Sequence, residues 1–189
     1  FAGWQAGPVL RASTNGIGDC GSSTWSDQAD MAWATHIEAS FSYAVSSTGP
    51  LADGLALVIQ DTSDSALGDF GYGLGYLNGG MTNSLAVAFR TFIFEEVVVS
   101  HDMVDWADVT LTRTDDEGAT SGHDVVIDIT RDPGASTGTL DLYLDGSGTA
   151  ALTTTVDWPT AGSYLGFTAG AGGYTQTSTV DDLTVTWHN

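Results

Sequence analysis

The groups in this sequence that could carry out catalysis are a serine in a glycine-flanked string, four histidines and several carboxylate pairs. Ser136 lies in the string Gly-Ala-Ser-Thr-Gly over residues 134–138, which matches the turn around the nucleophile of many hydrolases. That turn needs a strand before the serine and a helix after it, whereas here Pro133 precedes the string and a strand pattern follows. The string therefore predicts a hairpin loop. A histidine could act as a general base, but the sequence shows no partner arrangement for any of the four, His36, His101, His123 and His188.

Carboxylate pairs could cleave glycosidic bonds if their oxygens lay about 5–9 Å apart. Two candidate pairs are Asp124 with Asp128 and Asp141 with Asp145. A spacing of four residues along a strand separates the side chains by about 13 Å, because each residue rises ~3.3 Å. Glu95 and Glu96 are adjacent and would point to opposite faces of a strand. The glycine-rich residues 71–75 precede neither a helix nor a lysine, so they match no phosphate-binding loop. We therefore expect no enzymatic activity.

The chain is strongly acidic, with 24 Asp and Glu residues against 4 arginines and no lysine, and its formal net charge is −20. Such a field repels nucleic acids and anionic membranes. Aspartate predominates, which is typical of a saline or marine habitat or of a calcium-rich extracellular setting, and part of the excess reflects turns. Charged residues make up only 15% and hydrophobic residues 42%, which indicates a folded protein.

Two further features limit the class of protein. The single cysteine, Cys20, excludes an internal disulfide framework and a zinc site built from four thiolates. The apolar runs, such as residues 55–59, are far shorter than the ~20 residues that a membrane-spanning helix needs. We therefore expect no membrane insertion and a fold stabilised by its hydrophobic core.

Alternation of apolar and polar residues predicts strands throughout the chain. Clusters of Gly, Ser, Asp and Pro separate these runs every ~8–15 residues, as in a sandwich of antiparallel sheets. No internal repeat or linker divides the sequence. We therefore predict one all-β domain over residues 1–189, a two-sheet antiparallel β-sandwich. The alternating segments are 35–45, 109–113, 139–145 and 183–187, and the segments apolar at both parities, typical of central strands, are 55–59 and 85–94.

Several stretches, taken in order, resemble the L-type lectins, the legume-lectin-like carbohydrate binders and their bacterial relatives. They are 35–43 (THIEASFSY), 52–60 (ADGLALVIQ), 67–76 (LGDFGYGLGY), 83–92 (NSLAVAFRTF), 140–146 (LDLYLDG) and 164–173 (YLGFTAGAGG). The resemblance extends from about residue 9 to the end of the chain. It implies a concanavalin A-like jelly roll, which agrees with the β-sandwich predicted from the alternation.

The resemblance also implies a sugar site in loops at one edge of the curved sheet. Asp53, in an Ala-Asp-Gly turn whose Ala52–Asp53 peptide is expected to be cis, would accept hydrogen bonds from sugar hydroxyls. A backbone N–H from Gly71 or Gly73 would assist, and an aromatic ring in residues 71–75 or 172–175 would pack on the sugar. The implied sugar-binding residues are Asp53, Gly71, Tyr72, Gly73, Gly173 and Tyr174.

The sequence departs from the family at the positions that supply its calcium and transition-metal ligands, which here are Ala88, Arg90 and Phe94. An alanine cannot ligate, and an arginine places a fixed positive charge where a dication would sit. We therefore expect no metal, with calcium left as an open alternative. Arg90 would pair instead with Asp53 or another loop acid. The weak candidates for a rearranged site are Glu95, Glu96, His101 and Asp102, with Asp105 nearby.

The leading hypothesis is a non-catalytic module of a secreted or cell-surface protein, for example an adhesin, that binds a glycan or polysaccharide. One alternative is a structural or protein-interaction sandwich with a degenerate sugar site. A glycan-cleaving enzyme on the same fold is less favoured, because no close acid pair is visible. The identity of the glycan, the parent protein and the oligomeric state are left open.

Overall fold

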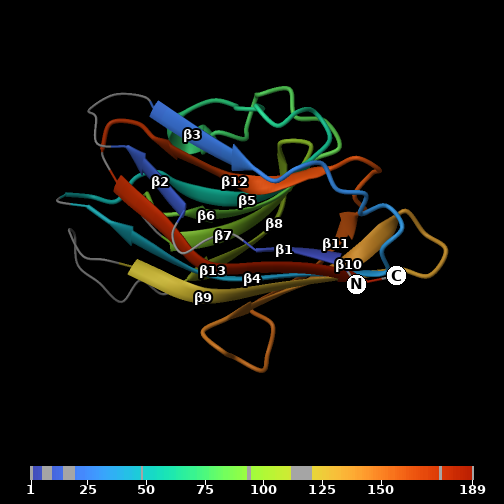
Figure 1. Cartoon of the computed structure of the whole chain (residues 1–189). Helices are drawn as coiled ribbons and strands as arrows, with labels where there is room; N and C mark the ends of the chain where they lie inside the picture. The colour runs from blue at the N-terminus through green and yellow to red at the C-terminus, as the bar shows by residue number, and fades with distance from the viewer. Residues whose placement is uncertain are drawn as a thin grey trace.

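The computed structural model is built from two antiparallel sheets packed face to face, which confirms the predicted all-β sandwich (Figure 1). The structure describes residues 2–5, 10–14, 20–47, 49–92, 95–111, 121–174 and 176–188. In the seven-stranded back sheet the strand order is β1-β13-β4-β9-β10-β11, and β2 also pairs with β13. In the six-stranded front sheet the order is β3-β12-β5-β6-β7-β8.

The back sheet consists of β1 (Ala2–Gln5), β2 (Leu10–Thr14), β4 (His36–Ser46), β9 (Ser121–Arg131), β10 (Thr137–Leu144), β11 (Leu152–Asp157) and β13 (Gln176–His188). The front sheet consists of β3 (Cys20–Trp25), β5 (Gly54–Gln60), β6 (Leu85–Arg90), β7 (Glu95–His101), β8 (Val104–Leu111) and β12 (Tyr164–Ala171). A 3-10 turn, η1 (Gly71–Gly73), lies in the segment between β5 and β6. The described part of the chain contains no helix long and apolar enough to cross a membrane.

In β4 every second side chain is apolar and lies between the two sheets, as the alternation predicted. The buried residues are Ile37, Ala39, Phe41, Tyr43 and Val45. Phe41 packs edge-on against Phe89 of β6 and Phe167 of β12, with ring centroids 5.9 and 5.1 Å apart. Such edge-to-face pairs add to the stabilisation that burial alone supplies. This contact joins the two sheets through their central strands.

A second, smaller core explains why β5 and β6 are apolar at both parities. Their other face is covered by residues 61–84, which pack Leu74, Tyr76 and Met81 onto Ala56, Val58, Ala86 and Ala88. Both faces of these strands are therefore dry, as in a central strand covered on both sides. The strand predicted over 85–94 ends at Arg90, and residues 93 and 94 lie outside the described ranges.

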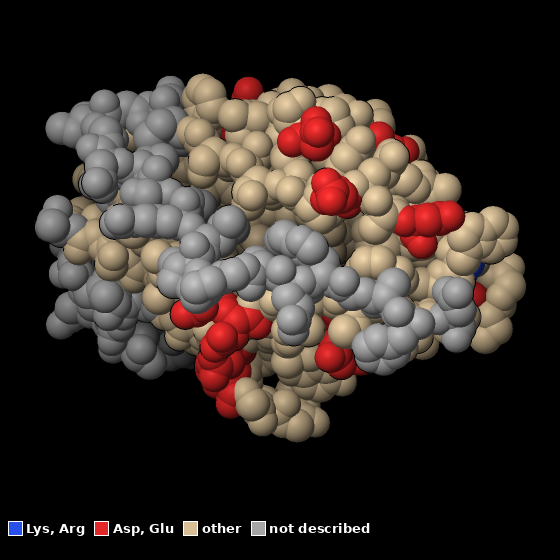
Figure 2. All heavy atoms as spheres, viewed as in Figure 1, with Lys and Arg blue, Asp and Glu red and all other residues tan. Residues whose placement is uncertain are grey.

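The loop containing Ser136 connects β9 to β10, which confirms the hairpin predicted for residues 134–138. The carbonyl of Ser136 accepts a hydrogen bond from the backbone N–H of Trp158 at 2.8 Å. The face drawn in Figure 2 is acidic. Asp and Glu side chains lie at several separate places on it, and Lys or Arg atoms are barely visible.

Candidate functional site

Asp53 lies just before the first residue of β5, where two backbone hydrogen bonds fix its position. Its N–H donates to the carbonyl of Gly170 at 3.0 Å, and its carbonyl accepts from the N–H of Thr91 at 2.9 Å. The Ala52–Asp53 peptide is cis, as the resemblance implied. The Asp53 residue is 8% exposed. The sheet therefore holds this largely buried residue at the level of the loops, between β12 and the residue that follows β6.

Gly71 brings the backbone of the η1 turn against this carboxylate. Its φ is +57°, in the left-handed region that favours glycine. A Cβ at this position would lie 3.5 Å from Oδ2 of Asp53 and 3.7 Å from Cα of Gly172. A side chain there would fill the space next to the carboxylate. Glycine at position 71 therefore keeps that space open.

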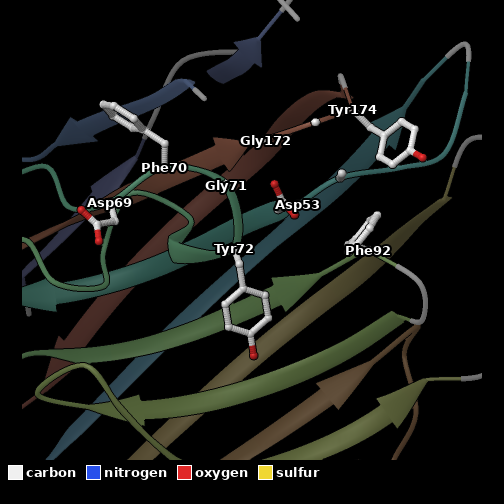
Figure 3. Close-up of a pocket in the computed structure, with 10 residues that line it drawn as sticks. Asp53, Asp69, Phe70, Gly71, Tyr72, Phe92, Gly172 and Tyr174 are labelled. Carbon is white, nitrogen blue, oxygen red and sulfur yellow. The ribbon is translucent and has the colours of Figure 1, made fainter. Parts of the chain in front are cut away.

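Asp53 and Gly71 line a pocket of about 470 Å³ at this edge of the front sheet (Figure 3). In Figure 3, Asp53 lies between Tyr72 on one side and Phe92 and Tyr174 on the other. The Phe92 and Tyr174 rings contact each other, with centroids 5.8 Å apart and planes 33° apart. The residues lining the pocket are Ala52, Asp53, Asp69, Phe70, Gly71, Tyr72, Phe92, Gly172, Gly173 and Tyr174.

The rim of the pocket is aromatic and open to solvent. Phe70 is 45% exposed, Tyr72 56%, Phe92 37% and Tyr174 46%. Large apolar side chains at the surface of a soluble domain are unusual when they gather in one place, and they mark binding sites. A carboxylate below exposed rings can accept hydrogen bonds from a ligand whose apolar face packs on those rings.

The structure brings together most of the residues that the sequence suggested. Asp53, Gly71, Tyr72, Gly173 and Tyr174 all line the pocket. Gly73 does not line it; this residue is buried and donates its N–H to the carbonyl of Phe70 at 3.0 Å. Thr175, in the loop 172–175, lies outside the described residues.

Five lining residues were not among the predicted sugar-binding residues: Ala52, Asp69, Phe70, Phe92 and Gly172. Ala52 and Gly172 are direct neighbours of the predicted Asp53 and Gly173. Asp69 and Phe70 directly precede Gly71 in the stretch 67–76 that resembles the lectins, so their place next to Gly71 could have identified them. Phe92 lies within residues 85–94, whose continuous apolar pattern predicts a central strand rather than a loop. The early end of β6 at Arg90 instead leaves Phe92 in a loop at the rim.

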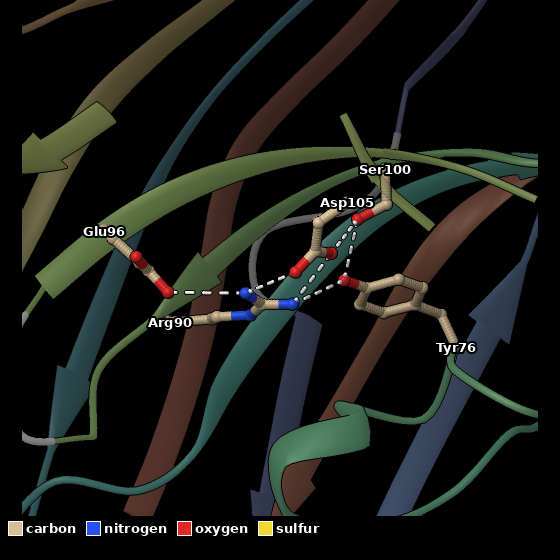
Figure 4. Close-up of polar contacts among 5 residues, drawn as sticks. All are labelled: Tyr76, Arg90, Glu96, Ser100 and Asp105. Carbon is tan, nitrogen blue, oxygen red and sulfur yellow. Dashed lines mark hydrogen bonds and ion pairs between the residues drawn. The ribbon is translucent and has the colours of Figure 1, made fainter. Parts of the chain in front are cut away.

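Beside the pocket, the buried Arg90 side chain is the centre of an ionic cluster (Figure 4). Its guanidinium donates to both oxygens of Asp105 at 3.0 Å each, and to Oε1 of Glu96 at 3.3 Å. It also donates to the hydroxyl of Tyr76 at 3.5 Å and lies 4.3 Å from the ring centre of Tyr72. Since Tyr72 lines the pocket, Arg90 connects the pocket wall to the sheet.

Arg90 thus pairs with two acids on strands, Glu96 and Asp105, whereas the sequence predicted Asp53 or another loop acid as its partner. Arg90 is only 4% exposed. Burial is the largest single effect and acts to lower its pKa. The hydrogen bonds to Asp105 and the electrostatic interactions with Tyr76, Asp105 and Tyr72 together outweigh it, so the net shift of the pKa is upward. Because Arg90 stays charged, it holds the carboxylates of Glu96 and Asp105 in place.

At the positions where the sequence predicts substituted metal ligands, the two described residues, Ala88 and Arg90, supply no ligand for a divalent ion. Ala88 is fully buried in the smaller core, and Arg90 fills its surroundings with a positive charge. Phe94 lies outside the described residues. In the ranges that the structure describes, no group of three or more His, Cys, Asp or Glu side chains could hold a metal ion.

The four weak ligand candidates are separated from one another. Glu96 is bound to Arg90, and Glu95 faces the interior under Tyr43. His101 lies at the other end of β7, where its Nδ1 is 3.1 Å from a carboxylate oxygen of Asp157. Asp102 accepts a hydrogen bond from the N–H of Ser84 at 2.9 Å. Each group therefore has a structural partner, and the four do not converge on one point.

Chelation is expected to leave the melting temperature within about 2 °C of its value in calcium, because no described ligand set depends on an ion. Thermal unfolding followed by circular dichroism, with and without a chelator, measures this. A decrease of more than about 10 °C, which is several kcal/mol for a domain of this size, would contradict the expectation and indicate a rearranged calcium site.

A second ionic cluster lies between the sheets at the end of β7. The hydroxyl of Tyr43 donates to Oε1 of Glu95 at 3.1 Å, and Nε2 of His123 lies 3.5 Å from the same oxygen. Nδ1 of His123 is 2.8 Å from Oδ2 of Asp145. The hydrogen bond to Glu95 is the main cause that raises the pKa of His123 to about 9, against a smaller opposing effect of burial.

His123 is therefore expected to make stability depend on pH in the alkaline range. Its folded-state pKa lies above the unfolded value of about 6.5, so protonated His123 contributes fully below pH ~6.5 and loses its contribution as the pH rises through about 9. Because the ring remains partly solvated, we expect a loss on the order of 1–2 kcal/mol. Denaturant unfolding at pH 6, 7.5 and 9.5 measures it.

The variant His123→Gln should remove most of this pH dependence. His36→Gln, which changes a histidine paired with Asp128 on the back sheet, is the matched control and should retain it. An equal slope in the parent protein and in His123→Gln would show that other groups cause the effect.

Comparisons with known proteins identify the fold. No family model matches the sequence, and no curated protein sequence matches it. Among solved structures, the metal-free form of lectin I-B4 from Griffonia simplicifolia is similar at a TM-score of 0.73 and 16% identity, over 96% of this chain and 88% of that one. Winged bean acidic lectin in complex with methyl-α-D-galactose is similar at 0.65 and 15%, over 99% and 98%.

The exoplasmic/lumenal domain of VIP36 in its Ca²⁺- and mannose-bound form is similar at a TM-score of 0.64 and 15% identity, over 98% of this chain and 82% of that one. The architecture is therefore that of the L-type lectins, the jelly-roll sandwich that legume lectins and VIP36 share. At these identities the comparisons establish the fold, and the chemistry of the site comes from the residues of this chain.

Proposed function

We propose that this protein is a non-catalytic glycan-binding module and that the pocket around Asp53 is its sugar site. The observation that carries the proposal is a largely buried carboxylate at the base of a pocket rimmed by four exposed aromatic rings. A sugar presents hydroxyl donors along its edge and C–H groups on its face. An acceptor-only carboxylate next to aromatic rings complements both surfaces.

The fold and its relatives support this assignment. Winged bean acidic lectin and VIP36 were solved with galactose and mannose ligands bound, and this chain has the same architecture over nearly its whole length. We propose that residues 1–189 act as one such domain of a secreted or cell-surface protein. We further propose that sugar binding needs no metal ion, since Arg90 occupies the surroundings in which a dication would lie.

A glycan array probed in chelator and again in calcium tests the proposal. We expect the same glycans to be bound in both conditions, with competition by soluble sugar. Reducing-end release from a polysaccharide panel, measured in parallel, should stay at background. Absence of binding to every glycan would favour a structural or protein-interaction module, and release of sugar would favour an enzyme.

Tyr174→Ala is expected to weaken glycan binding about 3- to 10-fold, because an aromatic stacking contact contributes roughly 0.5–1.5 kcal/mol beyond buried area. Trp33→Ala is the matched control, since Trp33 is 73% exposed and does not line the pocket. Titration calorimetry on both variants measures the difference. Equal affinities in the two variants would move the sugar site away from this pocket.

A further inference from the structure

The lining of the pocket contains two carboxylates, Asp53 and Asp69, and no Lys, Arg or His. In Figure 3, Asp53 lies at the centre of the pocket, whereas Asp69 lies at its edge beside Phe70, with its carboxylate directed away from Asp53. Oδ2 of Asp69 accepts a hydrogen bond from the side-chain amide of Asn78 at 3.0 Å. We propose that the ligand contains a sugar with a free amino group, such as a 2-amino-2-deoxyhexose, bound as its ammonium ion. This inference rests on the proposed function and specifies its ligand class.

The charges around the pocket favour a cation. Arg90 lies against the pocket wall, beneath Tyr72, but it is bound by both Glu96 and Asp105, so this cluster adds one net negative charge. The whole chain has no lysine and a formal charge of −20. A sugar bearing a carboxylate or sulfate would meet no described positive partner in the pocket and would be repelled by the surrounding acids.

An ammonium group forms stronger hydrogen bonds with these carboxylates than a hydroxyl does. It supplies three N–H donors, whereas a hydroxyl supplies one, and hydrogen bonds between charged groups are about twice as strong as neutral ones. Asp53 is largely withdrawn from water, which strengthens the attraction further.

The aromatic rim adds a second cation-binding element. A ring face attracts a cation within about 6 Å of its centre. One face of Tyr72 is already covered by the guanidinium of Arg90. Phe92 and Tyr174, which contact each other at the other side of Asp53, provide the remaining ring surface. N-acetylation of the sugar would remove the positive charge that the carboxylates and the aromatic rings both attract.

Three disaccharides that differ only in the group at C2 of each ring test the inference: a β-1,4-linked glucosamine disaccharide, its N-acetylated form, and cellobiose, which has hydroxyls in place of the two amines. By titration calorimetry at pH 6 we expect the amine form to bind at least about 10-fold more tightly than either other form. This preference should disappear as the pH rises past the pKa of the amine, about 8 for a model amino group.

Two aspartate variants separate a specific site from general attraction to an acidic protein. Asp69→Asn should reduce the preference for the amine severalfold. Asp64→Asn removes the same charge from an exposed residue of the same segment that does not line the pocket, and should leave the preference unchanged. An equal reduction in both variants would mean non-specific attraction and would overturn the inference.

The remaining outcomes distinguish this inference from the proposed function. If cellobiose or other neutral sugars bind in an Asp53-dependent manner as tightly as the amine, the glycan-binding function stands and the amine preference is wrong. If neither neutral nor amino sugars bind, the glycan-binding function itself fails, and the inference fails with it.

Discussion

Asp53→Ala is expected to weaken glycan binding by roughly 30- to 700-fold, which corresponds to a loss on the order of 2–4 kcal/mol. The change removes a charged acceptor that can take two hydroxyl or ammonium donors at once. Its backbone hydrogen bonds to Gly170 and Thr91 do not involve the side chain, so the loops should keep their positions. Titration calorimetry and circular dichroism melts on the same sample measure affinity and stability together.

Asp64→Ala is the charge-matched control and should bind as the parent protein does. Lost binding with a melting temperature close to that of the parent would support a sugar site at Asp53. Unchanged affinity in Asp53→Ala would place the sugar elsewhere. A parent that binds no glycan, together with a large decrease in the melting temperature of the variant, would favour a structural role for this carboxylate.

Arg90→Met is expected to lower the free energy of unfolding by about 3 kcal/mol, the low end of the cost of breaking a buried ion pair. The variant leaves Glu96 and Asp105 facing each other without the guanidinium that holds both. The cost stays at the low end because the Asp105 side chain is 45% exposed and can be hydrated. For a domain of this length, a decrease of roughly 6–12 °C in melting temperature follows.

Arg131→Met is the control for loss of an arginine without stranded carboxylates. The Arg131 guanidinium donates to the carbonyls of Ala32 and Ala135 and lies 5.5 Å from the ring centre of Trp158. Its loss leaves neutral acceptors, which cost less to desolvate than charges. If Arg90→Met costs no more than Arg131→Met, the ionic cluster contributes little to stability. Asp105→Asn, which keeps one acceptor oxygen, should fall between the parent and Arg90→Met.

The fold was largely predictable because alternation reports directly on burial. In β4, the five apolar residues predicted to face inward are all buried. Segment 55–59 and the first part of segment 85–94, residues 85–89, are covered on both faces, as their apolar residues at both parities predicted. The end of β6 was not predictable, since Phe92 continues the apolar pattern after the strand has ended and only the tertiary structure places its ring at the rim.

The pocket was predictable in part because its central residues are close in sequence to recognisable turns. Asp53 and Gly71 were identified from short motifs, and the structure brings them together. The adjacent Glu95 and Glu96 were expected to point to opposite faces of the strand, and their partners confirm this. Glu95 contacts Tyr43 between the two sheets, and Glu96 contacts Arg90 on the other face of the front sheet.

The partner of Arg90 could not be predicted from alternation, because a register shift intervenes. Val99 pairs with Ala107 whereas Ser100 pairs with Asp105, so β8 contains one extra residue at this point. Counting every second residue back from Val109 would place Asp105 in the interior. The bulge turns it instead to the face on which it meets Ser100 and Arg90.

Arg90 is part of the chain, so its stabilising effect on the pocket wall differs from that of a bound ion in how it depends on concentration. The stabilisation that a bound ion gives grows with the logarithm of its free concentration and vanishes on dilution. A guanidinium attached to the backbone is present at one fixed, intramolecular concentration, as in any linked binding group. The contact between Arg90 and Tyr72 therefore forms with the fold itself, and its strength does not depend on the binding of an ion to either residue.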